Sequence, residues 1–136
     1  MADALANAYE DDVLDHILGV TQMSYQAGGL YIALFDTSAS LANLEANTHT
    51  GEIAGNGYAR TAVTFTASSG GATSNNADVT FPNASGGNWG TVRYAAVMTA
   101  STAGSVIVYG QLTADKVVND GDTFKFNLGD FDISIA

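Results

Sequence analysis

The period of the hydrophobic pattern changes once along this chain, at Gly28-Gly29, and this change constrains the fold more than any other feature. Before the glycine pair, residues 3–18 place apolar side chains three and four positions apart, which is the spacing of one face of an α-helix. After the pair, apolar residues form short runs or alternate with polar residues, as in β-strands. The pattern therefore predicts an N-terminal helical segment, residues 1–27, followed by a β-sandwich domain, residues 28–136.

The predicted helix has signals at both ends. Asp3 can cap its N-terminus, and Gly19 lies where a left-handed residue commonly ends a helix. A helix of this length is marginal in isolation, so its apolar face must pack on something. We expect it either to cover its own β domain or to dock on a neighbouring protein. We favour docking, because a helical arm followed by a flexible glycine pair is a simple tether. The residues expected to make the contact are Leu5, Tyr9, Leu14, Ile17 and Leu18.

Seven segments after the glycine pair are rich in β-branched and aromatic residues and are separated by glycine turns such as Asn56-Gly57 and Asp120-Gly121. These segments are residues 30–35, 60–65, 79–81, 92–98, 106–112, 124–128 and 131–135. Short strands with turns between them predict a mainly β fold. We expect an antiparallel β-sandwich or jelly-roll-like domain of seven or eight strands with one N-terminal α-helix. The predicted core residues are Leu30, Ile32, Leu34, Val63, Phe65, Phe81, Val97, Ile107, Leu112, Phe124, Phe126, Ile133 and Ile135.

The segment 36–57 does not fit this strand pattern. It runs for about twenty residues with little periodicity, which is uncommon for a connection inside a compact domain. Long irregular connections are often contact or binding loops. We therefore expect this segment to be a loop with a contact role.

The charge balance excludes several classes of partner. The chain has 4 Lys and Arg residues against 14 Asp and Glu residues, for a net charge of −10. So few cations cannot neutralise a nucleic-acid backbone or bind an anionic membrane surface, and we expect neither partner. No apolar run approaches the ~20 residues of a membrane-spanning helix. The absence of Cys removes disulfides and thiolate chemistry, and the first residues lack the basic region of a secretory signal.

The few residues that could carry chemistry have simpler interpretations. His16 could bind a metal with Asp12 four residues before it, but we interpret it as a residue near a helix C-terminus, where a cation is favourable. His49 lies in the segment 36–57, where a solvent or contact position is expected. Asp120-Gly121-Asp122 is interpreted as a hairpin turn, because the acids that an EF-hand loop requires do not follow.

No arrangement in the sequence predicts catalysis. The acidic residues lie in the helix, loops and turns, and nothing makes two of them converge on a cleft. Neither a Gly-x-Ser-x-Gly elbow nor a phosphate-binding loop occurs. We predict a protein that is not an enzyme, with no catalytic residues, no cofactor and no metal site. Trp89 begins a strand after a glycine-rich turn, and burial in the core or in an interface is favoured over a sugar-stacking role; we include it among the interface residues.

Several segments, taken in order, are similar to small virion proteins of tailed bacteriophages of the kind labelled tail fibre protein. The end of the helix, Leu14-Asp15-His16-Ile17-Leu18-Gly19, is similar to the usual opening of this family. The strand 93–98 departs from the family pattern, in which a more aromatic, glycine-containing strand is expected. The segments that carry the resemblance are 30–35, 57–60 leading to 63–65, 79–82, 89–92, 109–113 and 118–124.

The resemblance implies a non-enzymatic bacteriophage virion structural protein, a tail fibre or fibre-attachment component assembled as a homo-oligomer. Because fibres have threefold symmetry, it favours a homotrimer in contact with other virion proteins of the tail. It implies a place in the virion after assembly in the host bacterial cytoplasm. A first alternative is a capsid decoration (cement) protein that binds the major capsid protein on the phage head. A second alternative is a glycan-binding host-receptor module that uses Trp89, Tyr94 and the segment 36–57.

Overall fold

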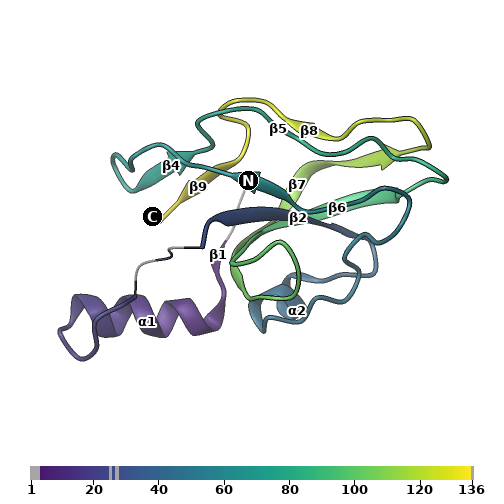
Figure 1. Cartoon of the computed structure of the whole chain (residues 1–136). Coiled ribbons are helices and arrows are strands. Elements are labelled where there is room, and N and C mark those ends of the chain that lie inside the picture. Colours follow the sequence, from purple (N-terminus) through teal and green to yellow (C-terminus); the bar gives the residue numbers. More distant parts are fainter. Residues whose placement is uncertain (1–3, 25, 27, 136) are drawn as a thin grey trace.

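The computed structural model describes residues 4–24, 26 and 28–135 of the chain (Figure 1). The fold is mainly β, with antiparallel sheets and one N-terminal helix, as predicted. The described residues form two helices, α1 (Asn7–Ile17) and α2 (Leu41–Glu45). The strands are β1 (Ala4–Leu5), β2 (Leu30–Asp36), β3 (Thr61–Val63), β4 (Ala72–Ser74), β5 (Val79–Thr80), β6 (Gly90–Met98), β7 (Val106–Val118), β8 (Lys125–Phe126) and β9 (Asp132–Ser134).

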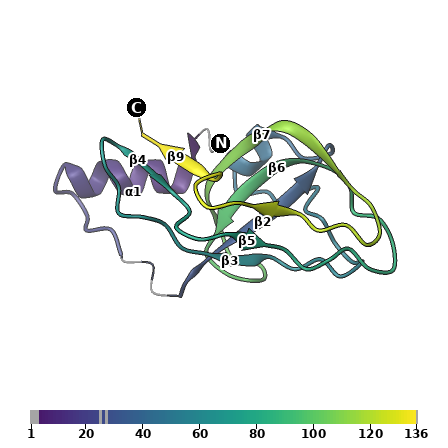
Figure 2. The same cartoon turned by 90° about the horizontal axis from the view of Figure 1, so that it is seen from above.

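The described strands form two layers. One layer is a five-stranded sheet in the order β1-β7-β6-β2-β3, built around the long β6–β7 hairpin. The other layer consists of two short antiparallel ladders, β4 with β9 and β5 with β8. Figure 1 shows the ladders above the larger sheet, and Figure 2 shows that β4 and β9 lie toward the end from which α1 projects. The sheets do not close into a barrel.

The main core lies between the two layers. Ring contacts among four phenylalanines fill its centre: the centroids of Phe124 and Phe126 are 5.1 Å apart, and those of Phe126 and Phe131 are 5.2 Å apart. Phe81 packs edge-on to Phe124 at 5.6 Å. Edge-to-face pairs of this kind are favourable beyond the apolar area that they bury. These rings come from the ladders and the turns beside them, so the second layer is anchored by aromatic packing rather than by a continuous sheet.

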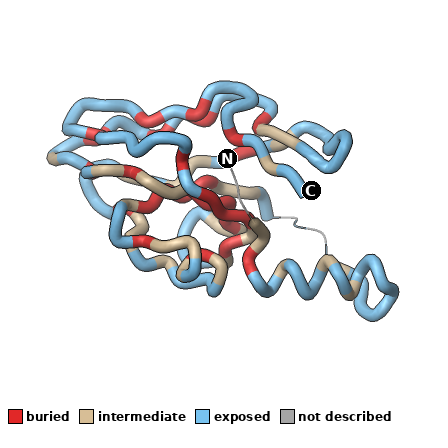
Figure 3. The backbone as a smooth tube through the Cα atoms, turned by 180° about the vertical axis from the view of Figure 1, so that it is seen from behind, coloured by how far each residue is buried: buried red, intermediate tan, exposed pale blue. Residues whose placement is uncertain are grey.

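A second core lies on the opposite face of the larger sheet, beneath α2. Strand β2 supplies both cores: Ile32 and Leu34 face the ladders, whereas Ala33 and Phe35 face the cluster that contains Leu44 of α2. Successive side chains of a strand point to opposite faces, so a strand covered on both sides must be apolar throughout. This burial explains the uninterrupted apolar run at residues 30–35 (Figure 3).

Twelve of the thirteen predicted core residues are buried or partly buried, but Ile135 is not. Ile135 is 72% exposed. Ile135 follows the last residue of β9 that pairs with β4, so its side chain lies beyond the sheet that covers Ile133. The prediction of Ile135 as a core residue was therefore wrong.

The helix is shorter than predicted at its N-terminal end. Leu5 lies in β1 and pairs with Val108 of β7, and the Ala6 N–H donates a 2.8 Å hydrogen bond to the Ile107 carbonyl. Residues that the helical spacing assigned to the helix therefore form a strand that pairs with the edge of β7. Ala6 precedes the helix with extended backbone and makes no side-chain cap. The predicted cap Asp3 lies outside the described residues, and Gly19 has the expected left-handed backbone (φ +74°).

The segment 36–57 contains a short helix that the sequence analysis missed. Ser40 caps α2, with its Oγ accepting a 3.1 Å hydrogen bond from the Asn43 N–H. Leu44 is fully buried and holds α2 against the larger sheet. A helix of five residues is too short to display a helical period, which is why the pattern showed only an irregular segment.

Candidate interface on the N-terminal helix

Helix α1 buries none of its residues, although it is the longest helix of the described structure. It extends beside the two layers rather than covering either of them (Figures 1 and 3). Most helical stability in proteins comes from packing an apolar face against other elements. A helix of this length with no fully buried residue therefore has an unused packing surface.

That surface consists of four large apolar residues at the C-terminal end of α1 and just after it. We call it the helix patch: Leu14, Ile17, Leu18 and Val20, which are 57%, 70%, 72% and 70% exposed. Only three other large apolar residues of the described chain are comparably exposed, namely Val117, Leu128 and Ile135. Exposed apolar residues are ordinary when scattered, but a contiguous group commonly marks an interface.

The other predicted contact residues on this segment lie at the anchored end. Leu5 packs against the core between the layers, and Tyr9 packs against the second core. Burial, with a smaller contribution from Asp12, raises the pKa of the Tyr9 hydroxyl above its ordinary value. The structure thus brings Leu14, Ile17 and Leu18 together on a free face, and it places Leu5 and Tyr9 where α1 joins the domain.

The chain folds back after α1 and covers a different face of the helix. The Val20 N–H donates to the Asp15 carbonyl at 2.8 Å, and the Met23 N–H donates to His16 Nδ1 at 3.3 Å. His16 is therefore engaged by backbone rather than grouped with ligands. In the described part of the chain, no group of three or more His, Asp or Glu side chains could hold a metal ion.

Trp89 lies inside the domain rather than at its surface. It is 7% exposed, its Nε1 donates a 2.9 Å hydrogen bond to the Asn56 carbonyl, and its ring packs edge-on to Tyr58 at 5.3 Å. Tyr94 is partly buried against the second core. Trp89 therefore offers no open face to a sugar or to another chain, and we leave it out of the interface proposed below.

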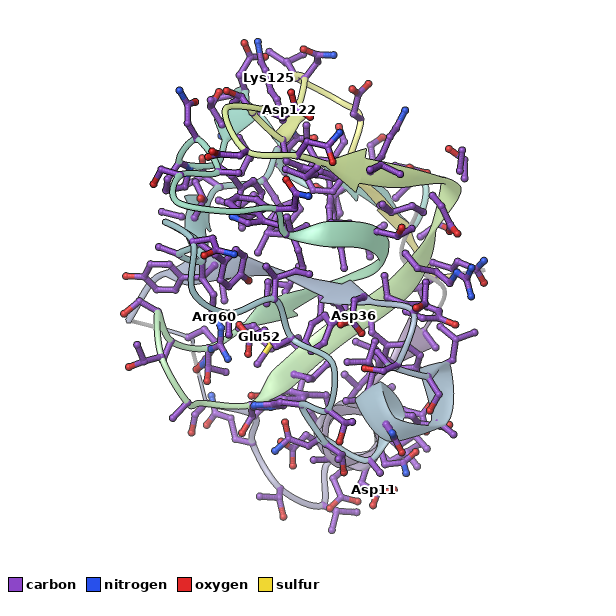
Figure 4. The ribbon with its side chains drawn as sticks, turned by 90° about the vertical axis from the view of Figure 1, so that its right-hand side faces the viewer. Asp11, Asp36, Glu52, Arg60, Asp122 and Lys125 are labelled. Atoms are coloured by element: carbon purple, nitrogen blue, oxygen red, sulfur yellow. The ribbon has the colours of Figure 1, made fainter. Side chains whose placement is uncertain are left out.

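A buried ion pair, which the sequence analysis did not identify, connects the segment 36–57 to the body of the domain. The Arg60 guanidinium donates to both carboxylate oxygens of Glu52, at 2.7 Å and 2.8 Å, and also to the carbonyls of Ala100 and Ala103. The Arg60 side chain is 4% exposed and that of Glu52 is 19% exposed. Figure 4 shows the two side chains together in the middle of the molecule.

The electrostatics of this cluster are those of a structural contact. The hydrogen bond to Glu52 raises the pKa of Arg60, and burial strongly raises the pKa of the Tyr58 hydroxyl, which bonds to Glu52. Both groups thus keep their ordinary charge states across the physiological pH range. A signal was available in the sequence, since an arginine is rare in so acidic a chain.

A cavity of about 640 Å³ lies between the end of β7 and the segment around β8. The acidic residues that line it accept hydrogen bonds within the adjacent turns. Asp122 accepts one from the Asn119 N–H at 2.9 Å, and Asp130 accepts one from the Asn127 N–H at 3.0 Å. Gly121 has φ +88°, so residues 120–122 form a turn, as predicted. The prediction of a hairpin was wrong, because β7 pairs with β6 and β1 whereas β8 pairs with β5. Figure 4 places Asp122 and Lys125 far from the Arg60–Glu52 pair. The carboxylates at this cavity thus stabilise the turns beside it.

The cations of the chain are almost all engaged by its own acids. Arg60 pairs with Glu52, Arg93 with Asp115 at 2.7 Å, and Lys125 with Asp78 at 2.8 Å. Lys116, which lines the cavity beside β7, is the fourth. With a net charge of −10, the surface is acidic. No helix among the described residues is long and apolar enough to cross a membrane.

Comparison with known proteins identifies the family. No curated protein matches this sequence. A family model described as podophage GP4 fiber I protein gp80 matches residues 4–134, which include the helix and both layers of strands. The match confirms the resemblance to phage tail fibre proteins that the ordered segments predicted. The chain belongs to the podophage GP4 fiber I protein gp80 family.

Proposed function

We propose that this protein is a non-enzymatic structural component of the phage tail, a fibre or fibre-attachment subunit that assembles as a homo-oligomer in the virion. The family supports a fibre role, and the exposed helix patch supports attachment through α1. The β-sandwich would be the rigid body of the subunit and the N-terminal segment its tether. A virion location, after assembly in the host cytoplasm, follows from the fibre role.

The observation that carries this proposal is the exposure of Leu14, Ile17 and Leu18 at the end of a helix that has no fully buried residue. In the free chain these side chains contribute little to folding, so their apolar character needs another explanation. Contact with a neighbouring virion protein supplies one, because burying each would remove apolar surface from water at roughly 25 cal/mol per Å².

Substitution of the apolar residues of the helix patch tests the proposal in assembled particles. A variant with Leu14→Gln, Ile17→Gln and Leu18→Gln should fold normally but enter particles at a much lower copy number. The matched control replaces two other exposed apolar residues, as Val117→Thr with Leu128→Gln, and should be incorporated like the unmodified protein. Equal incorporation of the two variants would rule out attachment through the helix.

We keep the predicted division of the chain into an N-terminal segment, residues 1–27, and a β-sandwich domain, residues 28–136, but the two parts share one sheet. Strand β1 belongs to the N-terminal segment but pairs with β7. Deleting residues 1–27 would therefore remove a strand as well as the helix. Substitutions within the patch separate attachment from folding more cleanly than that deletion.

The homo-oligomer is expected to be a trimer, because fibres are built on threefold axes. Sedimentation of the purified full-length chain at tens of micromolar should give the mass of three chains. A monodisperse monomer under those conditions would count against self-assembly. Copy number per virion separates the fibre from the capsid decoration alternative, since a decoration protein would be present in hundreds of copies.

A further inference from the structure

We propose that the helix patch docks on a protein other than this chain, in an apolar groove that presents a Lys or Arg side chain to Glu10. This inference rests on the proposed attachment function and specifies the chemistry of the partner. It follows from where the acids of α1 lie relative to the patch and from how the chain uses its own cations.

Glu10 lies within the apolar face of the helix and not opposite to it. Successive helical residues are rotated by about 100°, so residues four and seven positions apart share a face. Leu14 is four residues after Glu10, and Ile17 is seven residues after it. Leu14 and Ile17 are both apolar and exposed. The helical geometry places a carboxylate among them.

A second acid borders the same surface. Asp11 precedes Leu18 by seven residues and therefore lies beside it on the helix. Neither Glu10 nor Asp11 has an ion-pair partner among the described residues. Both residues are exposed. The exposed surface of α1 thus combines apolar side chains with two negative charges that no cation of the described chain pairs with.

Any partner that buries the helix patch must also accommodate Glu10. Removing a carboxylate from water without a counter-charge is unfavourable, and a buried carboxylate is normally paired with a cation and hydrogen-bonded. A groove that accepts Leu14 and Ile17 must therefore be apolar where it contacts them and must place a basic side chain next to Glu10. An amphipathic helix laid in an apolar groove is a common mode of recognition.

A second copy of this chain matches that chemistry poorly. Three of its four cations already pair with its own acids, and the fourth, Lys116, is exposed but lines a cavity together with Asp122 and Asp130, whose negative charge would oppose Glu10. Packing two α1 helices side by side in parallel would bring Glu10 against Glu10. Two chains of net charge −10 also repel each other. The homo-oligomer would accordingly form through other surfaces of the domain.

Photo-crosslinking in assembled particles tests the identity of the partner. Benzoylphenylalanine is placed at Ile17 in one variant and at Val20 in a second, so that a position that disturbs docking does not decide the result. We expect each to cross-link to a protein of different sequence, with Lys or Arg within a few residues of the attachment point. A cross-link to a second copy of this chain, or no cross-link from either position in particles that contain the chain, would overturn the inference.

Charge variants test the role of Glu10 itself. Glu10→Lys should lower incorporation at least about tenfold, because it places a cation against the partner's cation. The matched control, Asp12→Lys, makes the same change of charge on the face that the returning chain covers, and should alter incorporation less than about twofold. Similar losses for the two variants would contradict the inference.

The two proposals fail differently in these experiments. Absence of the unmodified chain from purified particles would remove the proposed fibre function. Presence of the chain, with its helix cross-linked to another copy, would leave that function in place and remove only the basic groove. A charge exchange provides the strictest form of the test: Glu10→Lys combined with Lys→Glu at the cross-linked partner residue should restore incorporation.

Discussion

At the scale of single residues, we expect the cluster of phenylalanine rings between the layers to contribute strongly to the free energy of unfolding. Phe126 is 6% exposed and packs against Phe81, Phe124 and Phe131. We expect Phe126→Ala to lower the free energy of unfolding by ~3–5 kcal/mol, measured by urea denaturation. Leu128→Ala is the control, since Leu128 is 66% exposed and should change stability by less than ~0.5 kcal/mol. A loss below ~1 kcal/mol for Phe126→Ala would contradict this account of the core.

The Arg60–Glu52 pair makes a different prediction, because one charge becomes unpaired when the other is removed. Arg60→Met should cost about 3–5 kcal/mol of unfolding free energy, since it leaves Glu52 without its counter-charge and frees the carbonyls of Ala100 and Ala103. The double variant Arg60→Met with Glu52→Gln should lose less than the sum of the two single variants. Additive losses in this double-mutant cycle would show that the two side chains are not coupled.

The Arg93–Asp115 pair, at the surface, should be visible in titration rather than in stability. Hydrogen bonds from Arg93 lower the pKa of Asp115. A carboxyl with a lowered pKa in the folded state favours folding above its unfolded pKa, and this contribution is lost as the pH falls through the folded pKa. We expect Arg93→Gln to raise the pKa of Asp115 toward its ordinary value in an NMR titration, with Asp78, paired to Lys125, unchanged as the control. An unchanged Asp115 would show that the pair is not formed in solution.

At the scale of elements, the helix and the sheet should differ in local stability. The β6–β7 hairpin lies in the middle of the larger sheet, whereas α1 buries no residue. Amide hydrogens of α1 should therefore exchange much faster than those of β6 in the free chain. Protection of α1 equal to that of β6 would show that the helix is already packed in the free protein, which would leave the patch without an unused surface.

Most elements could be predicted because their signals are local. The apolar run of β2 and the alternation at residues 124–126 identify strands directly, and Gly121 identifies a turn. Where the prediction was wrong, a non-local contact or a short length was responsible. Leu5 follows the helical spacing but pairs with Val108, more than one hundred residues away. Likewise, α2 depends on the buried Leu44, which a five-residue segment does not reveal.

The candidate interface was predictable in part for the same reason. Helical spacing selected Leu14, Ile17 and Leu18, and the structure leaves them exposed on one face. Burial of Trp89 was predicted, but spacing could not show that it is buried in the core rather than in an interface, because its hydrogen bond to Asn56 and its contact with Tyr58 join distant parts of the chain. Nor could it separate a helix that covers its own domain from one that projects beside it.

At the scale of the whole molecule, the protein combines a well-packed body with one unpacked element. Two cores on either side of the larger sheet hold the body together without disulfides. The acidic surface keeps copies apart except where a specific contact overcomes their repulsion. In the proposed function, the exposed face of α1 is the surface through which this chain would attach to the particle.

Imaging of the intact particle by cryo-electron microscopy would show whether α1 docks on a neighbouring protein of the tail. We expect density for the β-sandwich at the tail, with α1 seated in a groove of that protein and the side chains of Leu14 and Ile17 covered. Density for the domain on the head, or at the tail with α1 surrounded by solvent, would contradict it.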